Sequence, residues 1–331
     1  MKRNKNISLY PPLVFNIFKP ARITSYDVVR HFKRNLPQGF GKIGHFGTLD
    51  PFASGVLMIG VSGAARLNDF VHDFLPKTYL AVGKLGIETP TGDYTSEITQ
   101  KDESLYLRRE IAALPVSFIE EKLREKFLGN YWQAPHKYSA SKFQGKNLHE
   151  WAREGVEIKK EPVLRYVHNI HVVKYAFPYL SVRVEVSSGT YVRTLFSDMC
   201  NYLGTIGSLI ALVREKVGNV GFQAALKKGQ WPHDREPSFM NRGMPIEQVL
   251  PFSTYCLNEA QVKAFKNGAF LKPEQLECSF RSELSEIYYW MSDESGKLLG
   301  LGEKKTPYEL RPKINFHSED QASLSSDHDQ E

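Results

Sequence analysis

The sequence predicts an α+β fold with a large N-terminal domain followed by a small β-rich domain. Amphipathic helix patterns that begin near residues 24 and 117 are separated by stretches that alternate like strands. A second group of short strand-like runs, between Ile287 and Leu301, follows a segment without sustained periodicity. At 331 residues and 41% hydrophobic content, the chain is long enough to bury two cores.

The first helix is predicted to begin at Thr24 and to stop before Pro37. Apolar residues recur there at helical spacing, at Val28, Phe32 and Leu36. The exposed side of this helix would carry several basic residues, which could meet phosphates or simply face water.

A second helix is predicted from a capping box of Ser117 and Glu120 to a stop at Gly129. Strands are predicted over residues 79–86 and 181–186, where apolar and polar side chains alternate. These elements would form the scaffold of the larger domain.

The domains are expected to span residues 11–230 and 251–316. Residues 231–250 contain three prolines and a glycine and have no period, so they are expected to be a linker. The strand-like runs around Ser295-Gly296-Lys297 predict a hairpin in the second domain. Residues 317–331 are polar and acidic, and we expect them to be disordered.

Composition excludes several classes of protein. The longest apolar stretch, residues 55–65, is too short for a membrane span, which needs about 20 residues. A basic N-terminus followed by prolines is not a secretory signal. The three scattered cysteines and the dispersed histidines indicate neither a disulfide framework nor a metal site. We therefore expect a cytoplasmic protein without a metal or cofactor.

The charge balance favours a polyanionic partner. The whole chain has a net charge of +6, but its last fifteen residues hold five acids and no Lys or Arg. The rest therefore carries 43 basic side chains against 32 acidic ones. Such an excess suits phosphate binding, although composition leaves a solvated basic surface as the alternative.

Common catalytic motifs are absent from the sequence. It contains no Gly-x-Gly-x-x-Gly, no phosphate-loop lysine motif, no Gly-x-Ser-x-Gly and no His-Glu-x-x-His. Dinucleotide-dependent enzymes, nucleoside triphosphatases, serine hydrolases of that type and zinc proteases are therefore disfavoured.

Residues 44–57 carry the most informative motif, GHFGTLDPFASGVL. Its glycines, including Gly47, permit backbone conformations that a side chain forbids, and Pro51 biases Asp50 towards an extended conformation. A carboxylate held in this way projects from its loop and is a candidate catalytic group. An ordinary Asp-Pro turn that leads into a buried strand is the alternative.

A second motif, SGTYVRTL over residues 188–195, is expected to be extended, with Tyr191 and Arg193 on one face. An arginine beside a buried aspartate lowers the pKa of that aspartate, and a tyrosine ring offers a plane for an unstacked base. The alternative is an ordinary ion pair with a core aromatic.

Residues 133–148 interleave lysines and aromatic residues without core periodicity. This composition is typical of a nucleic-acid-binding loop. A solvated surface loop has a similar composition, so the segment alone does not decide between them.

Taken together, these segments resemble the TruB family of pseudouridine synthases over roughly residues 11–316. Two positions depart from the family pattern: Arg22 replaces a usual glycine, and Phe46 replaces a small residue. The matching motifs, in order, are Lys19-Pro20 to Thr24-Ser25, Gly44 to Leu57, Lys77-Thr78-Tyr79 and Gly189 to Leu195.

The resemblance implies a pseudouridine synthase fold, with a mixed, mostly antiparallel sheet flanked by helices and loops, and a PUA-like second domain. Asp50 would act at the sugar, either as a nucleophile at C1′ or as a base towards the ribose. Tyr79 would stack on the base and assist proton movement at C5. The implied catalytic residues are Asp50, Tyr79 and Arg193, and the implied substrate-binding residues are His45, Tyr191, Leu212, Lys19 and Gly47.

The resemblance also implies the substrate, uridine 55 in the T-loop of tRNA, which would be flipped out of its stack. Residues 133–157 would clamp the RNA, and the PUA-like domain would contact the acceptor end. No cofactor, membrane or obligatory protein partner is implied, and we expect a monomer. Two other functions remain open: an RNA-binding or RNA-folding protein without catalysis, suggested by Phe46, and a guide-dependent synthase acting on ribosomal RNA.

Overall fold

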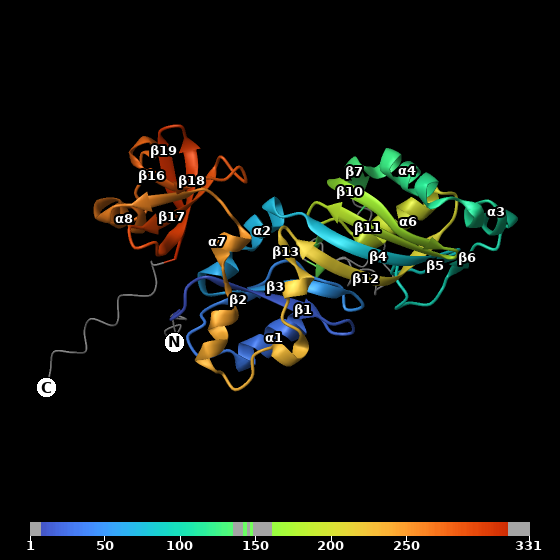
Figure 1. Cartoon of the computed structure of the whole chain (residues 1–331), viewed down its shortest axis with the longest axis horizontal. Helices are drawn as coiled ribbons and strands as arrows, with labels where there is room; N and C mark the ends of the chain where they lie inside the picture. Colours follow the sequence, from blue (N-terminus) through green and yellow to red (C-terminus); the bar gives the residue numbers. More distant parts are fainter. Residues whose placement is uncertain (1–7, 135–141, 144–145, 148–160, 317–331) are drawn as a thin grey trace.

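A computed structural model describes residues 8–134, 142–143, 146–147 and 161–316 (Figure 1). Most of the predicted RNA-clamping segment 133–157 and the whole predicted tail 317–331 lie outside the described residues. Within that segment, β8 (Lys142–Phe143) pairs with β9 (Lys146–Asn147). In the part of the chain that is described, no helix is both long and apolar enough to cross a membrane.

A ten-stranded sheet forms the body of the molecule, in the order β14-β1-β3-β12-β4-β11-β10-β7, with β2 added to β3 and β13 to β12. Every pairing is antiparallel except that of β3 with β12, which confirms the predicted mixed, mostly antiparallel sheet. Its strands are β1 (Leu13–Lys19), β2 (Ile43–His45), β3 (Ser54–Val61), β4 (Lys77–Leu85), β7 (Gly129–Gln133), β10 (Val163–Ala176), β11 (Tyr179–Val186), β12 (Gly207–Val217), β13 (Val220–Gly221) and β14 (Met244–Pro245).

The first helix forms where the sequence predicts it. Thr24 caps its N-terminus by accepting from the Asp27 N–H, and the Asp27 carboxylate accepts in return from the Thr24 backbone. Val28 and Phe32 are buried against β1 and β3. Among the described residues, the helices of this domain are α1 (Ser25–Asn35), α2 (Asn68–Phe74), α3 (Leu105–Arg109), α4 (Val116–Phe127) and α6 (Val192–Tyr202). A small side sheet pairs β5 (Ile87–Glu88) with β6 (Gln100–Lys101).

The capping box predicted for the second helix is wrong. Helix α4 begins two residues earlier than the box requires, with Pro115 at the N-cap and no side-chain cap. Glu120 instead accepts a 2.8 Å bond from the Val172 N–H and faces the His171 ring. Its carboxylate therefore ties α4 to β10, a tertiary contact that local spacing could not reveal.

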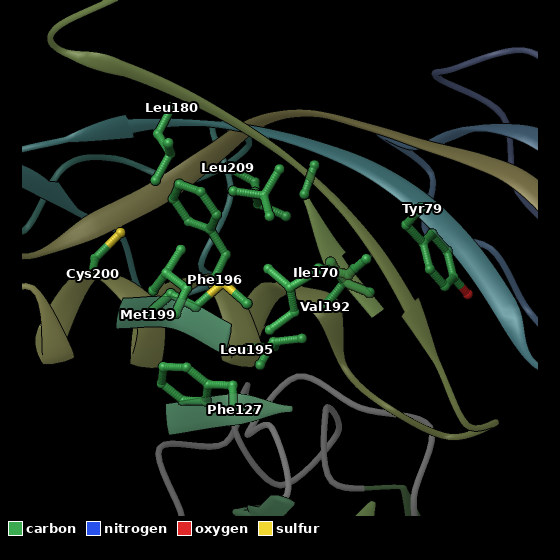
Figure 2. Close-up of a cluster of buried hydrophobic side chains, with 14 of the residues drawn as sticks. Tyr79, Phe127, Ile170, Leu180, Val192, Leu195, Phe196, Met199, Cys200 and Leu209 are labelled. Atoms are coloured by element: carbon green, nitrogen blue, oxygen red, sulfur yellow. The ribbon is translucent and has the colours of Figure 1, made fainter. Parts of the chain in front are cut away.

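The extended conformation predicted for residues 188–195 is also wrong. Helix α6 begins at Val192, with Tyr191 as its N-cap. Leu195, Phe196 and Met199 are buried against the sheet (Figure 2). Their spacing, together with Val192, is the i, i+3, i+4, i+7 pattern of a helix face, which the sequence therefore contained.

Residues 231–250 do more than connect two domains. Trp231 and Phe239 are buried against α1, and β14 pairs with β1 at the edge of the large sheet. The segment follows the 3-10 turn Lys228–Gln230 and includes the 3-10 turn Pro237–Arg242 and the short helix α7 (Ile246–Val249).

The C-terminal β-rich sheet lies at one end of the molecule, beyond α7 (Figure 1). Its strand order is β16-β15-β17-β18-β19, and the predicted hairpin is the antiparallel pair β17–β18. Trp290 is fully buried and donates to the Leu250 carbonyl at 2.7 Å, in an apolar cluster shared with β1 and β3. The elements are β15 (Thr254–Leu257), α8 (Glu259–Lys266), β16 (Glu277–Phe280), β17 (Tyr288–Asp293), β18 (Leu298–Thr306) and β19 (Glu309–Asn315).

Candidate active site

The loop between β2 and β3 carries Asp50, and its two flanking residues are anchored on either side. The Ser25 hydroxyl, at the start of α1, accepts from the Leu49 N–H at 2.9 Å and donates to the Leu49 carbonyl at 3.1 Å. On the other side, the Arg22 N–H donates to the Pro51 carbonyl at 2.7 Å. Asp50 is thus presented by a loop whose backbone is held by α1 and by the turn that precedes α1.

Arg214 closes the base of the same loop, a role that the sequence did not reveal. It is 1% exposed, and its Nε donates to the Val56 carbonyl at 2.7 Å while Nη2 donates to the Gly47 carbonyl at 3.0 Å. Gly47 has φ of +87°, in the left-handed region that favours glycine. Gly55 is required for another reason, because a Cβ there would lie 2.2 Å from the Arg214 carbonyl oxygen.

Asp50 and Arg193, 143 positions apart in the sequence, form a two-pronged ion pair. Arg193 Nε lies 3.1 Å from Asp50 Oδ2, and Arg193 Nη2 lies 3.2 Å from Asp50 Oδ1. The Arg193 side chain is 8% exposed, whereas that of Asp50 is 35% exposed. A planar guanidinium that grips both oxygens fixes the carboxylate plane while one part of the carboxylate stays accessible.

A second carboxylate, Asp93, holds the far side of Arg193. Arg193 Nη1 lies 3.4 Å from Asp93 Oδ2 and donates to the Thr91 carbonyl at 2.8 Å. Asp93 is almost inaccessible and accepts further bonds from Thr91 Oγ1 and the Thr95 N–H. In the sequence this stretch, TPTGD, shows only turn chemistry, so Asp93 was missed.

Opposing effects set the protonation of Asp50. Burial raises the pKa of the Asp50 carboxyl above its ordinary value, and Arg193 opposes this rise. The negative charge of Asp93 adds to the rise. The expected lowering by Arg193 is therefore present, but burial outweighs it, and the net direction is upward.

Tyr79 and Leu212 line the apolar side of the site. Both are buried and belong to one cluster with Leu49, the neighbour of Asp50. Tyr79 lies at one end of this cluster, and its hydroxyl points away from the other labelled side chains (Figure 2). A ring of this kind offers an apolar wall with a polar tip.

His45 ends β2 and brings an unpaired polar atom to the start of the loop. Its Nδ1 is buried and has no hydrogen-bond partner among the described residues. Burial and the nearby Arg214 lower the pKa of His45, so the ring is neutral at physiological pH.

Lys19 lies beneath the loop and is fully buried. Its Nζ donates to the carbonyls of Ile23 at 2.8 Å, Pro20 at 3.0 Å and Pro51 at 3.4 Å. Burial lowers the pKa of Lys19 to about 8, although the nearby Asp50 opposes this effect. With its donors directed at carbonyls, Lys19 is placed to brace the loop, where the sequence had predicted contact with substrate.

Lys77, the first residue of the Lys-x-Tyr motif, is another buried cation. It is 5% exposed and donates to the Ser188 hydroxyl. Its Cε lies 3.5 Å from where a Cβ on Gly47 would be. Burial, with a further contribution from Arg214, lowers the pKa of Lys77 to about 7.

Phe46 points into the core between the two sheets, so it does not occupy the site. It is 1% exposed and belongs to the cluster that contains Trp290. Its ring fills the space beside Gly60, where a Cβ would come within 2.4 Å of the ring. The departure from the family pattern at this position is thus a packing substitution.

Tyr191 is fixed by Gln133, which the sequence placed only at the start of the predicted clamp. Gln133 is 2% exposed, accepts from the Tyr191 N–H at 2.8 Å and donates to the Tyr191 carbonyl at 3.0 Å. Nearby, the Tyr131 hydroxyl donates to Asp198 of α6. Two side chains of β7 therefore position the first turns of the helix that carries Arg193.

No cluster of three or more potential metal ligands occurs within the described ranges. The buried cations around Asp50, which are Arg193, Lys19 and Arg214, are instead committed to carboxylates and backbone carbonyls.

Comparison with known proteins identifies the family. A family model described as TruB family pseudouridylate synthase (N terminal domain) matches residues 33–192. A tRNA pseudouridine synthase B of Clostridium tetani is 33% identical over 294 residues, which cover 88% of this chain and 95% of the relative. The chain belongs to the TruB family of pseudouridine synthases. A TruB-family relative from Thermotoga maritima, also called tRNA pseudouridine synthase B, is 33% identical over 313 residues, with 93% and 95% covered.

Solved structures show the same fold as this TruB-family chain. A Cbf5-Nop10-Gar1 complex contains a chain with a TM-score of 0.67 and 22% identity, covering 92% of this chain and 84% of that one. An archaeal box H/ACA Nop10-Cbf5 complex gives a TM-score of 0.65 at 20% identity, with 93% and 87% covered. At this identity the likeness supports the pseudouridine synthase fold alone. As a member of the family, the protein is an isomerase.

Proposed function

We propose that this protein converts uridine 55 in the T-loop of tRNA to pseudouridine. The observation that carries the proposal is the accessible Asp50 carboxylate gripped by Arg193 in a family of uridine isomerases. Support for tRNA comes from the relatives, which are named tRNA pseudouridine synthase B. The excess of basic over acidic side chains outside the last fifteen residues suits a polyanionic substrate.

The reaction breaks the N1–C1′ bond of the uridine and forms a C5–C1′ bond. The proton lost from C5 is balanced by one gained at N1, so the composition does not change. In this proposal Asp50 acts at the sugar, because its accessible carboxylate is the acid held ready on the loop. It serves either as a nucleophile at C1′ or as a base towards the ribose, and both routes need the ionised form.

Arg193 keeps Asp50 oriented and opposes the effect of burial on its pKa. Tyr79 and Leu212 form the apolar wall against which the base rests, and the Tyr79 hydroxyl assists proton movement at C5. Tyr191, at the N-cap of α6, supplies a second wall. Gly47 lets the loop approach the nucleotide without a side chain in the way.

A stacked base hides C1′ and C5, so the uridine must be flipped out at a cost of a few kcal/mol. We assign His45 to the space that the base leaves, because its buried and unpaired Nδ1 needs a hydrogen-bond partner. The C-terminal domain contacts the acceptor end of the tRNA, and a T-arm hairpin is recognised largely by shape. The protein acts as a monomer in the cytoplasm, without an obligatory partner.

Asp50→Asn tests the proposal, because it removes the charge and preserves the shape. The variant should bind a T-arm hairpin normally but form no pseudouridine, as measured by derivatisation and mass shift. Asp69→Asn, at an exposed position of α2, is the matched control and should retain full activity. Full turnover by Asp50→Asn would refute the catalytic assignment.

The two alternative functions make different predictions for the same assay. A protein without catalysis would leave the hairpin unchanged, but Phe46, which suggested this function, is buried away from Asp50. A guide-dependent synthase would need additional RNA, and only structures at about 20% identity suggest it. Turnover of the naked hairpin by the purified chain would exclude both.

A further inference from the structure

Arg22 has an unusual backbone conformation for its residue type. Its φ is +71°, in the left-handed region where a side chain is unfavourable and glycine is not. The four positive-φ positions in residues 39–47 and at residue 55, near the site, are all glycine, as at Gly41 and Gly47. A strained residue beside a functional site suggests that its side chain has a function there.

The backbone at Arg22 is attached to the catalytic loop. Its N–H donates to the carbonyl of Pro51, the residue after Asp50, at 2.7 Å. Lys19 Nζ donates hydrogen bonds to the carbonyl of Ile23, the residue after Arg22, and to the carbonyl of Pro51. Arg22 is therefore presented from a braced turn at the edge of the site.

The guanidinium of Arg22 is available for a ligand. The residue is exposed, and no ion pair or side-chain hydrogen bond engages it within the described part of the chain. Other cations close to the loop are committed: Lys19, Arg193 and Arg214 are buried and bonded to carbonyls or carboxylates. Arg22 is thus the exposed cation of this turn.

We propose that Arg22 binds a backbone phosphate of the RNA, next to the uridine whose sugar meets Asp50. This inference rests on the proposed function, which puts C1′ of a flipped uridine at Asp50. Arg22 is hydrogen-bonded through its backbone to Pro51, the residue that follows Asp50. The phosphates on either side of that sugar therefore lie within reach of the Arg22 side chain. A guanidinium fork matches two phosphate oxygens and is better suited to this contact than an ammonium group.

The charge and the backbone strain can be separated by substitution. Arg22→Gly removes both the charge and the strain. Arg22→Gln removes the charge but keeps a side chain at a left-handed φ, and so keeps the strain. Arg22→Lys keeps both. Arg109→Gln is the control, because Arg109 is exposed on α3, at the far end of the sheet from the C-terminal domain (Figure 1).

The measurement is the dissociation constant of the full chain for a T-arm hairpin that already carries pseudouridine, so that binding is observed without turnover. A lost phosphate contact should reduce the slope of log K against log salt by about 0.7 to 0.9. Arg22→Gly and Arg22→Gln should both show this reduction and bind several-fold more weakly at low salt. Arg22→Lys and Arg109→Gln should keep the original slope.

Thermal unfolding supplies a second readout. Arg22→Gly should unfold at a higher temperature than Arg22→Gln, because only glycine relieves the strain. An unchanged salt slope in both uncharged variants would overturn the phosphate contact, whatever their stabilities. Turnover of the uridine hairpin by the wild-type chain is measured beforehand, and its absence would refute the proposed function separately.

Discussion

Arg193→Gln perturbs the centre of the candidate site. The wild-type guanidinium makes two contacts to Asp50, at 3.1 and 3.2 Å, and one to Asp93 at 3.4 Å. The substitution leaves two carboxylates in one partly buried region with no cation between them. It also removes the 2.8 Å bond that the Thr91 carbonyl accepts.

The size of the effect follows from burial. Removing one partner of a buried ion pair typically costs 3–5 kcal/mol, roughly, because the other charge stays behind. Asp93 is 4% exposed, but Asp50 is 35% exposed and is partly screened by water. We therefore expect a loss of about 3 kcal/mol in the free energy of unfolding at neutral pH, at the low end of that range. The rate should fall on the order of 100-fold or more, since the catalytic carboxylate loses its orientation.

The pH dependence has a defined sign. Arg193 lowers the pKa of Asp50, whereas burial and Asp93 raise it, so removing Arg193 moves this pKa further up. The folded variant then binds a proton more tightly than the unfolded chain, in which an aspartate titrates near 3.9, approximately. Lowering the pH through this raised pKa favours the folded variant. The difference in the free energy of unfolding between wild type and Arg193→Gln should therefore become smaller at low pH. The acid limb of the rate should shift to higher pH.

Urea unfolding at about pH 7.5 and about pH 5.5 measures the deficit, and single-turnover rates over the same range measure the acid limb. Arg183→Gln is the matched control, because Arg183 forms a 2.7 Å ion pair with Glu215 on the sheet and is 43% exposed. Its loss should cost less than about 1 kcal/mol. If Arg193→Gln lost no more free energy of unfolding than this control at both pH values, the ion pairs of Arg193 with Asp50 and Asp93 would not stabilise the site as described.

Two further variants test the support around the site. Gln133→Leu should lower kcat with little change in KM and cost about 1–3 kcal/mol of stability, because the Tyr191 N–H and carbonyl lose their partners. Gln133→Glu, which keeps the acceptor, should recover part of the rate; equal rates for both would contradict this role. Wild type should become more stable as the pH rises above 7, because Lys77 keeps its proton to a higher pH in the unfolded chain than in the folded protein. The gain measured by urea unfolding should be smaller in Lys77→Met, where Lys19, whose pKa is lowered to about 8, still contributes above that pH. Parallel pH dependences for wild type and Lys77→Met would contradict this prediction.

Local patterns predicted the parts of the fold that neighbouring residues decide. The start at Thr24, the apolar spacing and the stop before Pro37 placed α1 correctly, and the turn at Ser295-Gly296-Lys297 placed the β17–β18 hairpin. They failed where distant groups compete. Glu120 looked like part of a cap but bonds to β10, and residues after Tyr191 form a helix packed on the sheet.

The candidate site likewise has features that local sequence patterns predict and features that depend on contacts between distant residues. Residue identities and their local spacing were enough to show which groups are available: a loop that presents Asp50, an arginine, a tyrosine and the glycines that the backbone needs. Three other features emerged only in the folded molecule: Asp93 shares Arg193, Lys19 braces the loop from below, and Phe46 turns into the core. These outcomes depend on burial and on contacts between distant segments, which set pKa values and side-chain directions and leave no periodic trace in the chain.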